Sequence, residues 1–269
     1  MKKLLAAFFA LALVFSVSSC GKTGANSESG EGGSQSLTDT GAATTAEQEI
    51  TESDSASQEG FITDEIEDGI CIDGYNGTAS EIVIPSSIDG KPVVSIAYLA
   101  FCGNETIKKL VIPETVKMIG TRAFWKCKSL ESITFNEGIE IIDEGAFSDC
   151  YKITSVVFPS SIKEIRNNAF VKCSNLKTIE FVGAHDLKIR QNAFGETAVE
   201  NIILPEGVTE VGHEAFSYMP LKTVYIPASV TSIDPAAFMY SATDLTIRGK
   251  ASSVAESYAK EQDIPFVTE

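Results

Sequence analysis

The sequence predicts a solenoid of stacked β-rich coils, and three observations lead to this fold class. An Ala-Phe pair returns along the chain at steps of 23, 23, 23, 24, 22 and 22 residues. A short segment of alternating apolar residues, typical of a strand, precedes each pair at a similar distance. The spacing persists over more than half of the chain, which is the signature of stacked repeats. The seven pairs are Ala100-Phe101, Ala123-Phe124, Ala146-Phe147, Ala169-Phe170, Ala193-Phe194, Ala215-Phe216 and Ala237-Phe238.

Residues 1–20 are predicted to be a lipoprotein signal peptide. Lys2 and Lys3 precede an apolar run from Leu4 to Val17, which is too short and wrongly flanked for a stable membrane span. The sequence that ends this segment, VSSC, resembles a bacterial lipobox, and the resemblance implies a diacylglycerol on Cys20. An ordinary signal peptide with a chance cysteine is the alternative. Because two acyl chains hold a protein stably on a bilayer, we expect the mature chain to be anchored outside a bacterial membrane, at the cell surface.

Residues 21–60 are predicted to form a disordered acidic tether rich in Ser, Gly and Thr. They have almost no large apolar side chains, so burial cannot offset the entropy lost on ordering them. They carry eight acids and one lysine, a net charge of −7. The whole chain has a formal charge of −16, and removal of the two signal lysines makes it −18. This charge argues against binding to nucleic acid, whose phosphates are neutralised by lysine and arginine.

Each repeat is predicted to supply one strand, then a second apolar pair, then a turn at Ala-Phe. In Ile202-Ile203-Leu204, for example, the alternation points the first and third side chains inward. A proline often follows the strand and ends it, because proline has no amide hydrogen to donate. The alanine lets neighbouring coils approach closely, and the phenylalanine ring fills the centre of the coil. We therefore expect the rings to form one buried column.

Three cysteines, Cys127, Cys150 and Cys173, each follow the phenylalanine by three residues and are predicted to be buried free thiols. Zinc requires four converging ligands, and the two histidines of the chain, His185 and His213, do not recur in register with the cysteines. Parallel strands hold side chains ~4.8 Å apart, wider than the ~3.5–4.5 Å between the Cβ atoms of a disulfide. No metal site, disulfide ladder or cofactor is expected.

The repeat units resemble the leucine-rich repeats of BspA-like bacterial surface proteins. The unit from Leu130 to Cys150, LESITFNEGIEIIDEGAFSDC, follows the pattern L-x-x-I-x-F…I-x-x-I-x-x-x-A-F-x-x-C. The resemblance covers about residues 61–250. It implies a leucine-rich-repeat solenoid, β-rich with short helical turns, of about seven repeats of 22–24 residues.

Both ends of the solenoid also resemble this family. Residues 61–98 look like its first unit, and residues 251–269 look like a C-terminal cap with a short helix from Ala255 to Gln262. Terminal caps are expected because an open coil would expose the core. The segment from Val182 to Asp186 departs from the pattern, since it holds one extra residue and lacks the proline. A local bulge is predicted there.

Catalytic motifs are missing from the sequence. It contains no Gly-x-Ser-x-Gly elbow, no phosphate-binding loop and no His-Glu-x-x-His. Adjacent acids such as Asp143-Glu144 are interpreted as solvated turn residues and not as glycosidase carboxylates. We predict that the protein is not an enzyme; an enzyme would require a site that the sequence does not reveal.

Two surfaces are candidates for partner binding. One is the outward row of the predicted strands, because contiguous exposed apolar area often marks a partner site; the alternative is that β-branched residues merely suit strands. The other is the edge after the phenylalanines, where residue types typical of binding hot spots occur, unless they only pack locally. The outward row comprises Val83, Val111, Thr134, Val157, Glu180, Ile203, Tyr225 and Thr246, and the edge comprises Trp125, Tyr218, Met239 and Tyr240.

The family resemblance implies attachment to host matrix proteins, such as fibronectin and fibrinogen, or to other cells. We therefore expect a lipid-anchored surface protein whose solenoid binds protein partners. The alternative is a glycan-binding, nutrient-capture or envelope-scaffold lipoprotein. Sugar sites favour aromatic side chains, and the chain offers only Trp125 and a few tyrosines for that role.

Overall fold

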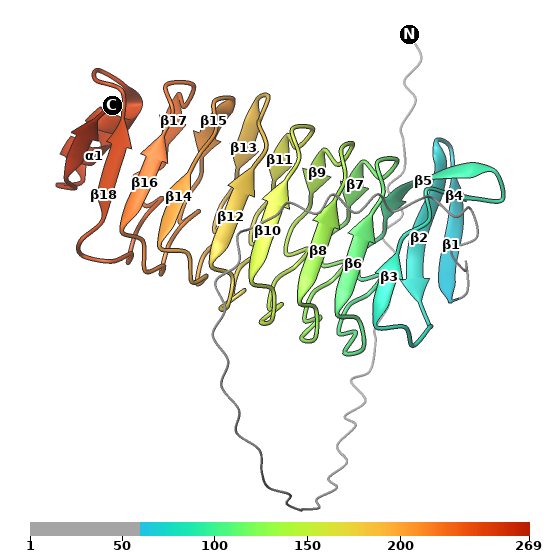
Figure 1. Cartoon of the computed structure of the whole chain (residues 1–269). Helices are drawn as coiled ribbons and strands as arrows, with labels where there is room; N and C mark the ends of the chain where they lie inside the picture. Colours follow the sequence, from blue (N-terminus) through green and yellow to red (C-terminus); the bar gives the residue numbers. More distant parts are fainter. Residues whose placement is uncertain (1–59) are drawn as a thin grey trace, which may run out of the picture. The chain divides into compact units, whose positions relative to one another are not determined.

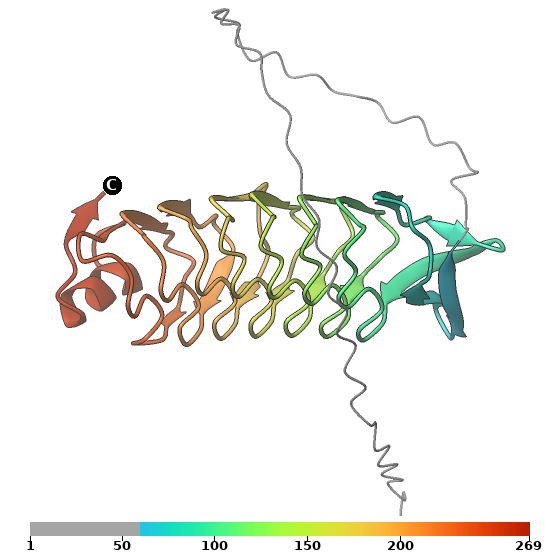
Figure 2. The same cartoon turned by 90° about the horizontal axis from the view of Figure 1, so that it is seen from below.

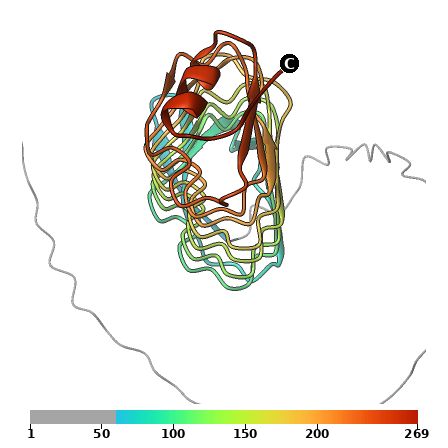
Figure 3. The same cartoon turned by 90° about the vertical axis from the view of Figure 1, so that its left-hand side faces the viewer.

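The computed structural model describes residues 60–269, which form a row of β coils closed by one helix (Figure 1). The predicted signal peptide, Cys20 and nearly all of the predicted tether lie outside the described residues. Viewed along the stack, successive coils lie over one another around a common interior (Figure 3). Within residues 60–269, no helix has the length and apolar character that crossing a membrane requires.

Each repeat contributes a strand to two sides of the solenoid (Figures 1 and 2). The first side, which we call the strand face, contains β3 (Glu81–Val83), β6 (Lys109–Ile112), β8 (Ser132–Phe135), β10 (Ser155–Phe158), β12 (Thr178–Phe181), β14 (Asn201–Ile203), β16 (Thr223–Ile226), β18 (Thr246–Gly249) and β19 (Phe266–Thr268). The second side, the long sheet, contains β1 (Phe61–Ile66), β2 (Gly69–Tyr75), β5 (Lys91–Ile96), β7 (Met118–Ile119), β9 (Ile141–Ile142), β11 (Glu164–Ile165), β13 (Leu187–Ile189), β15 (Val208–Val211) and β17 (Ser232–Ile233), with β4 (Ser87–Ile88) paired to β5.

The two sides differ in continuity. The long sheet runs unbroken in the order β1-β2-β5-β7-β9-β11-β13-β15-β17, whereas the strand face divides into the sheets β3-β6-β8, β10-β12 and β14-β16-β18-β19. All pairs are parallel except β1 with β2 and β4 with β5. Parallel pairing of equivalent strands keeps each inward residue directly above its counterpart in the next coil, as Val156 is above Ile179.

The predicted column of phenylalanine rings is confirmed. Successive ring centroids lie 4.6 to 5.6 Å apart, and the ring planes are within 13° of parallel. The rings from Phe124 to Phe216 are fully buried. At the N-terminal end Phe61 and Tyr75 contact the first ring, and at the C-terminal end Tyr258 lies edge-on to the last.

The Ala-Phe segments are hydrogen-bonded turns. The short helical turns expected there are therefore single turns that do not continue into helices. Around Phe124, the amides of Ala123 and Trp125 donate to the carbonyl three residues earlier, while those of Arg122 and Phe124 donate to the next coil. Arg122 has a φ of 55° and Lys126 a φ of 60°, and these left-handed residues prevent a continuous helix. The single α-helix of the described residues is the predicted cap, α1 (Val254–Glu261).

The predicted buried thiols are also present. The Sγ atoms of Cys127, Cys150 and Cys173 donate to a phenylalanine carbonyl of the preceding coil at 3.1, 3.2 and 3.2 Å. Burial raises the pKa of Cys127 and Cys173 to about 12 and that of Cys150 well above its ordinary value. The five cysteines of the described region are all free, and Cys102 is exposed.

The expected bulge lies in the coil with the extra residue. Val182 occupies the place of the proline and is 71% exposed. The register between β13 and β15 shifts between Leu187 and Lys188. The strand face is also interrupted on this coil, between β12 and β14.

Candidate functional site

The outward row of the strand face is an aligned surface on which some side chains are exposed and others, such as Val111 and Tyr225, are half-buried. Val83 pairs with Val111, Val157 pairs with Glu180, and Ile203 pairs with Tyr225. Ile203 is 70% exposed and Val157 is 45% exposed, large values for aliphatic side chains. A β-strand points alternate residues to opposite sides, so the same alternation that buries Ile202 and Leu204 directs Ile203 to solvent.

One residue of the predicted row was placed wrongly. Thr246 pairs with Thr223, and the residue in register with Tyr225 is Arg248. Leu245 and Ile247 are both buried and so resemble an inward pair, but Leu245 precedes β18. The second inward place of β18 belongs to Gly249, whose lack of a side chain hides the alternation.

The uncompensated charges of the strand face are acidic. Glu81 pairs with Lys109 at 2.8 Å, and Arg248 pairs with Glu269, so the two cations of this face are engaged. Glu180, in β12, and Glu206, in the turn that follows β14, have no ion-pair partner among residues 60–269. On this face the free carboxylate of Glu180 therefore lies beside the exposed Val157 of the neighbouring strand.

The long sheet carries a connected network of charges. Arg166 contacts Asp143 at 3.1 Å and Glu164 at 2.8 Å, and Arg190 contacts Glu164 at 2.6 Å and Glu210 at 2.8 Å. Burial acts to raise the pKa of the Glu164 carboxyl, but hydrogen bonds from the two arginines outweigh it and lower that pKa. These groups satisfy one another, so they offer little to an external ligand.

The predicted aromatic edge separates into two places. The rings of Tyr218 and Tyr240 stack with centroids 4.6 Å apart, and both are exposed, with Met239 beside them in sequence. Trp125 belongs to the coil of Phe124, four coils before that of Phe216. The edge is therefore not one continuous site, because several coils separate Trp125 from the two tyrosines.

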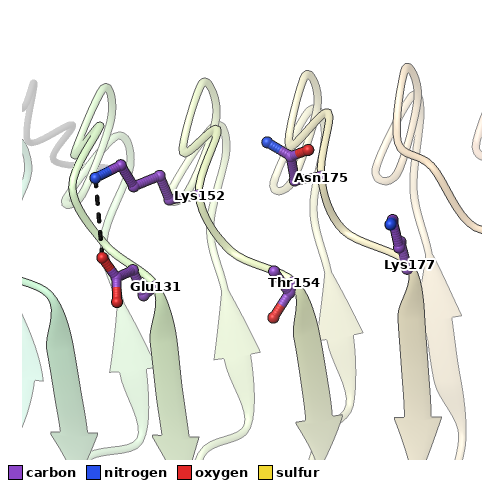
Figure 4. A pocket seen from close by; sticks show the side chains of 5 residues that line it. All are labelled: Glu131, Lys152, Thr154, Asn175 and Lys177. Carbon is purple, nitrogen blue, oxygen red and sulfur yellow. Dashed lines mark ion pairs between the residues drawn. The ribbon is translucent and has the colours of Figure 1, made fainter. Parts of the chain in front are cut away.

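A shallow hollow of about 420 Å³ lies between the turns and the strand starts of three consecutive coils (Figure 4). Lys152 and Glu131 form an ion pair at 3.8 Å across it. The side-chain amide of Asn175 donates from Nδ2 to the backbone carbonyl of Tyr151 at 2.6 Å, which fixes the upper rim of the hollow. The lining is polar and includes Thr154 and Lys177, and the hollow is open to solvent. Among residues 60–269 no group of three or more side chains could hold a metal ion.

Comparisons with known proteins identify the repeat. The family model described as "BspA type Leucine rich repeat region" matches in six copies over residues 94–187, 137–245 and 184–261. The crystal structure of a leucine-rich repeat protein from T. pallidum is 23% identical, with 78% of this chain and 96% of that chain covered and a TM-score of 0.51. A leucine-rich cell surface protein from Faecalibacterium prausnitzii A2-165 is 20% identical over 71% of this chain and 75% of that chain, with a TM-score of 0.46. At 23% identity, the likeness to the T. pallidum protein concerns the fold alone. No curated protein matches the chain.

Proposed function

Because this chain belongs to the BspA-type leucine-rich repeat family, we propose that it is a non-catalytic, lipid-anchored surface protein whose strand face binds a protein partner. The observation that carries this proposal is the outward row with the exposed Val157 and Ile203 and the half-buried Tyr225, beside the free carboxylate of Glu180. Solenoids commonly bind partners through such extended faces. The lipobox-like sequence VSSC, which ends at Cys20, supports the lipid anchor.

The aliphatic residues of the row would supply affinity. Fully burying one side chain of the size of Val or Ile contributes ~1.5–3 kcal/mol. A few such side chains in the centre of a contact can dominate binding energy, while a polar rim excludes water. Ile203 suits this role because most of its surface is free in the unbound protein.

The carboxylates indicate the charge of the partner. Glu180 and Glu206 lack cations of their own, and the mature chain is strongly acidic. A partner surface that presents apolar side chains flanked by lysine or arginine would complement both features. A basic patch of a host matrix protein or of another cell's surface protein has this chemistry.

A binding assay with the chain from Gly21 to Glu269 tests the role of the face. A panel of immobilised matrix proteins would be probed with the parent, with the double variant Val157→Glu/Ile203→Glu and with Met118→Glu. Met118 is a matched control because it is a 37% exposed apolar residue in β7 of the long sheet.

We expect the parent and the control to bind, with affinity that falls as salt increases. The double variant should bind at least about tenfold more weakly, with an unchanged circular dichroism spectrum. Equal binding by the double variant would exclude this face. Absence of binding to every protein of the panel would contradict the proposed class of partner.

The anchor has a separate test in a bacterial host. The full chain and its Cys20→Ala variant would be expressed and fractionated. Retention of the parent in the membrane fraction and release of the variant are expected, because the acyl chains supply the membrane affinity. A variant that stays with the membrane would show that Cys20 is not the anchor point.

A further inference from the structure

A small hollow on the turn edge, distinct from the strand face, is built by one unusual coil. Its volume is about 200 Å³. In the coil of Phe147, the residue before the Ala-Phe pair is Gly145 and the residue after it is Ser148. Larger side chains occupy both positions in the coils on either side. The hollow, which we call the Gly145 slot, is lined by Arg122 and Trp125 from the preceding coil, by Gly145 and Ser148, and by Asn168 and Val171 from the following coil.

Gly145 leaves the slot open. Its φ is +60°, and a Cβ placed on it would lie 3.3 Å from Cγ of Arg122. In the neighbouring coils, Arg122 and Asn168 adopt the same left-handed conformation with full side chains. The backbone therefore does not require glycine at this position, and its effect is to leave space beside the Arg122 side chain.

Two cations gather at the wall formed by Trp125. Nζ of Lys126 lies 4.2 Å from the ring centroid, and Cζ of Arg122 lies 5.4 Å from it. Neither cation has an ion-pair partner among the described residues. The indole is fixed in place, because Nε1 donates to Oδ2 of Asp149 at 2.9 Å.

The nearby acids differ in availability. Asp149 is occupied, since its carboxylate also accepts hydrogen bonds from Ser148 at 3.1 Å and from Tyr151 at 2.8 Å. Glu144 lines the slot and is exposed. The slot thus combines two cations that lack ion-pair partners among the described residues, an apolar wall and one carboxylate able to accept hydrogen bonds.

We propose that the Gly145 slot binds one carboxylated sugar residue, a uronic or sialic acid, of an acidic glycan. The planar guanidinium of Arg122 matches a carboxylate with two parallel hydrogen bonds. The apolar face of the sugar ring packs against Val171 and the rim of the Trp125 indole, over whose ring the two cations lie, and the hydroxyls bond to Glu144 and Asn168.

Size and polarity favour a sugar over a larger ligand. Sites for drug-sized molecules measure ~300–1,000 Å³, so the slot accommodates a single ring. Glu144 accepts hydrogen bonds from hydroxyl groups, whereas it would repel a ligand that offered only carboxylates. This proposal does not depend on the strand face. A negative result at the slot would leave the proposed role of the strand face unchanged, and the reverse also holds.

Trp125 is the only tryptophan of the chain and lies in the slot, so its fluorescence reports occupancy. The chain from Gly21 to Glu269 would be titrated with sialyllactose and with trigalacturonic acid. Lactose and galactotriose are the neutral counterparts, and a triglutamate peptide tests for recognition of carboxylates alone. We expect a saturable fluorescence change with at least one acidic sugar, and binding of its neutral counterpart at least about tenfold weaker.

Two variants and one control complete the test. Arg122→Gln removes the guanidinium that would bind the carboxylate, and Gly145→Asn fills the slot with a residue that tolerates a positive φ. Both should weaken binding at least about tenfold, while Lys250→Gln, which changes an exposed lysine that directly follows β18, should bind as the parent does. No saturation with either acidic sugar, unchanged binding by Arg122→Gln, or equal affinity for the neutral sugar or the peptide would each overturn the proposal.

Discussion

On the long sheet, Arg166 and Arg190 pair with acids across four consecutive coils, whereas on the strand face Glu180 has no ion-pair partner among residues 60–269. The two sides share the same coils and the same column of rings. They differ in whether the charged groups among their outward residues have ion-pair partners. The comparison teaches that constant inward residues maintain the stack, while outward residues can either pair with the next coil or remain available to a partner.

The largest effect should come from the column on which both sides depend. Phe147→Ala would leave a cavity in mid-stack and lower the free energy of unfolding by ~3–5 kcal/mol. Phe238→Ala should cost less, because that ring has a parallel neighbour on one side and is slightly exposed. Chemical denaturation of both variants measures the difference. Small and equal losses would mean that the rings do not form the common core.

The next effect separates the two sides by charge. Glu164→Gln weakens two ion pairs of the long sheet and should lower stability by ~1 kcal/mol at pH 7, with partner binding unchanged. The folded pKa of Glu164 lies below its ordinary value of 4.5. Its contribution is therefore complete above about pH 4.5 and is lost as the pH falls through the folded pKa.

Denaturation curves at several pH values measure this effect. The difference in stability between the parent and Glu164→Gln should shrink as the solution is acidified. A difference that is constant from pH 7 to pH 3 would contradict the proposed role of the ion pairs.

A smaller effect concerns the turns that join the two sides. Lys172 has a φ of 63°, so Lys172→Gly should stabilise the fold by up to ~1 kcal/mol, since glycine adopts this conformation without steric cost. Its ion pair with Glu196, at 3.9 Å between exposed groups, contributes little. Lys177→Gly is the control, because Lys177 has no positive φ and the change should destabilise by ~0.5–1 kcal/mol. Thermal unfolding that ranks the two variants in the opposite order would refute this account.

The smallest change in stability is expected on the strand face itself. Ile203→Glu replaces a side chain that is already 70% exposed, so the free energy of unfolding should stay within about 0.5 kcal/mol of the parent. Calorimetry measures this value. A loss comparable to that of Phe147→Ala would show that the row belongs to the core and would remove the distinction between the two sides.

Sequence patterns predicted the interior well because the interior has few solutions. Once the period is known, the stacking of the phenylalanine rings and the alignment of the buried thiols can be predicted. The cap helix follows from the need to cover the last coil. Gly249 broke the alternation by which Thr246 was assigned, since a buried residue without a side chain gives no apolar signal.

The surface features were harder to predict because they depend on the shape of the coil in cross-section. The network of Arg166 and Arg190 requires knowing which residues of adjacent coils meet. Trp125 and Tyr218 lie on the same edge of the solenoid but in coils that are not adjacent. The slot had a signal in Gly145, the only glycine among the residues that precede the seven Ala-Phe pairs, but its meaning depends on the side chains above and below.

The contact of Phe61 with the end of the ring column has a mechanical consequence. A load pulling on the chain before Gly60 would reach the fold at the first residue of β1, where Phe61 pairs with Tyr75. The hydrogen bonds between β1 and β2 would then break one after another, starting from that pair. The rest of β1 is exposed. The resistance to the first strand separation would therefore come from three packed rings with centroids 5.2 to 6.5 Å apart, those of Phe61, Tyr75 and Phe101.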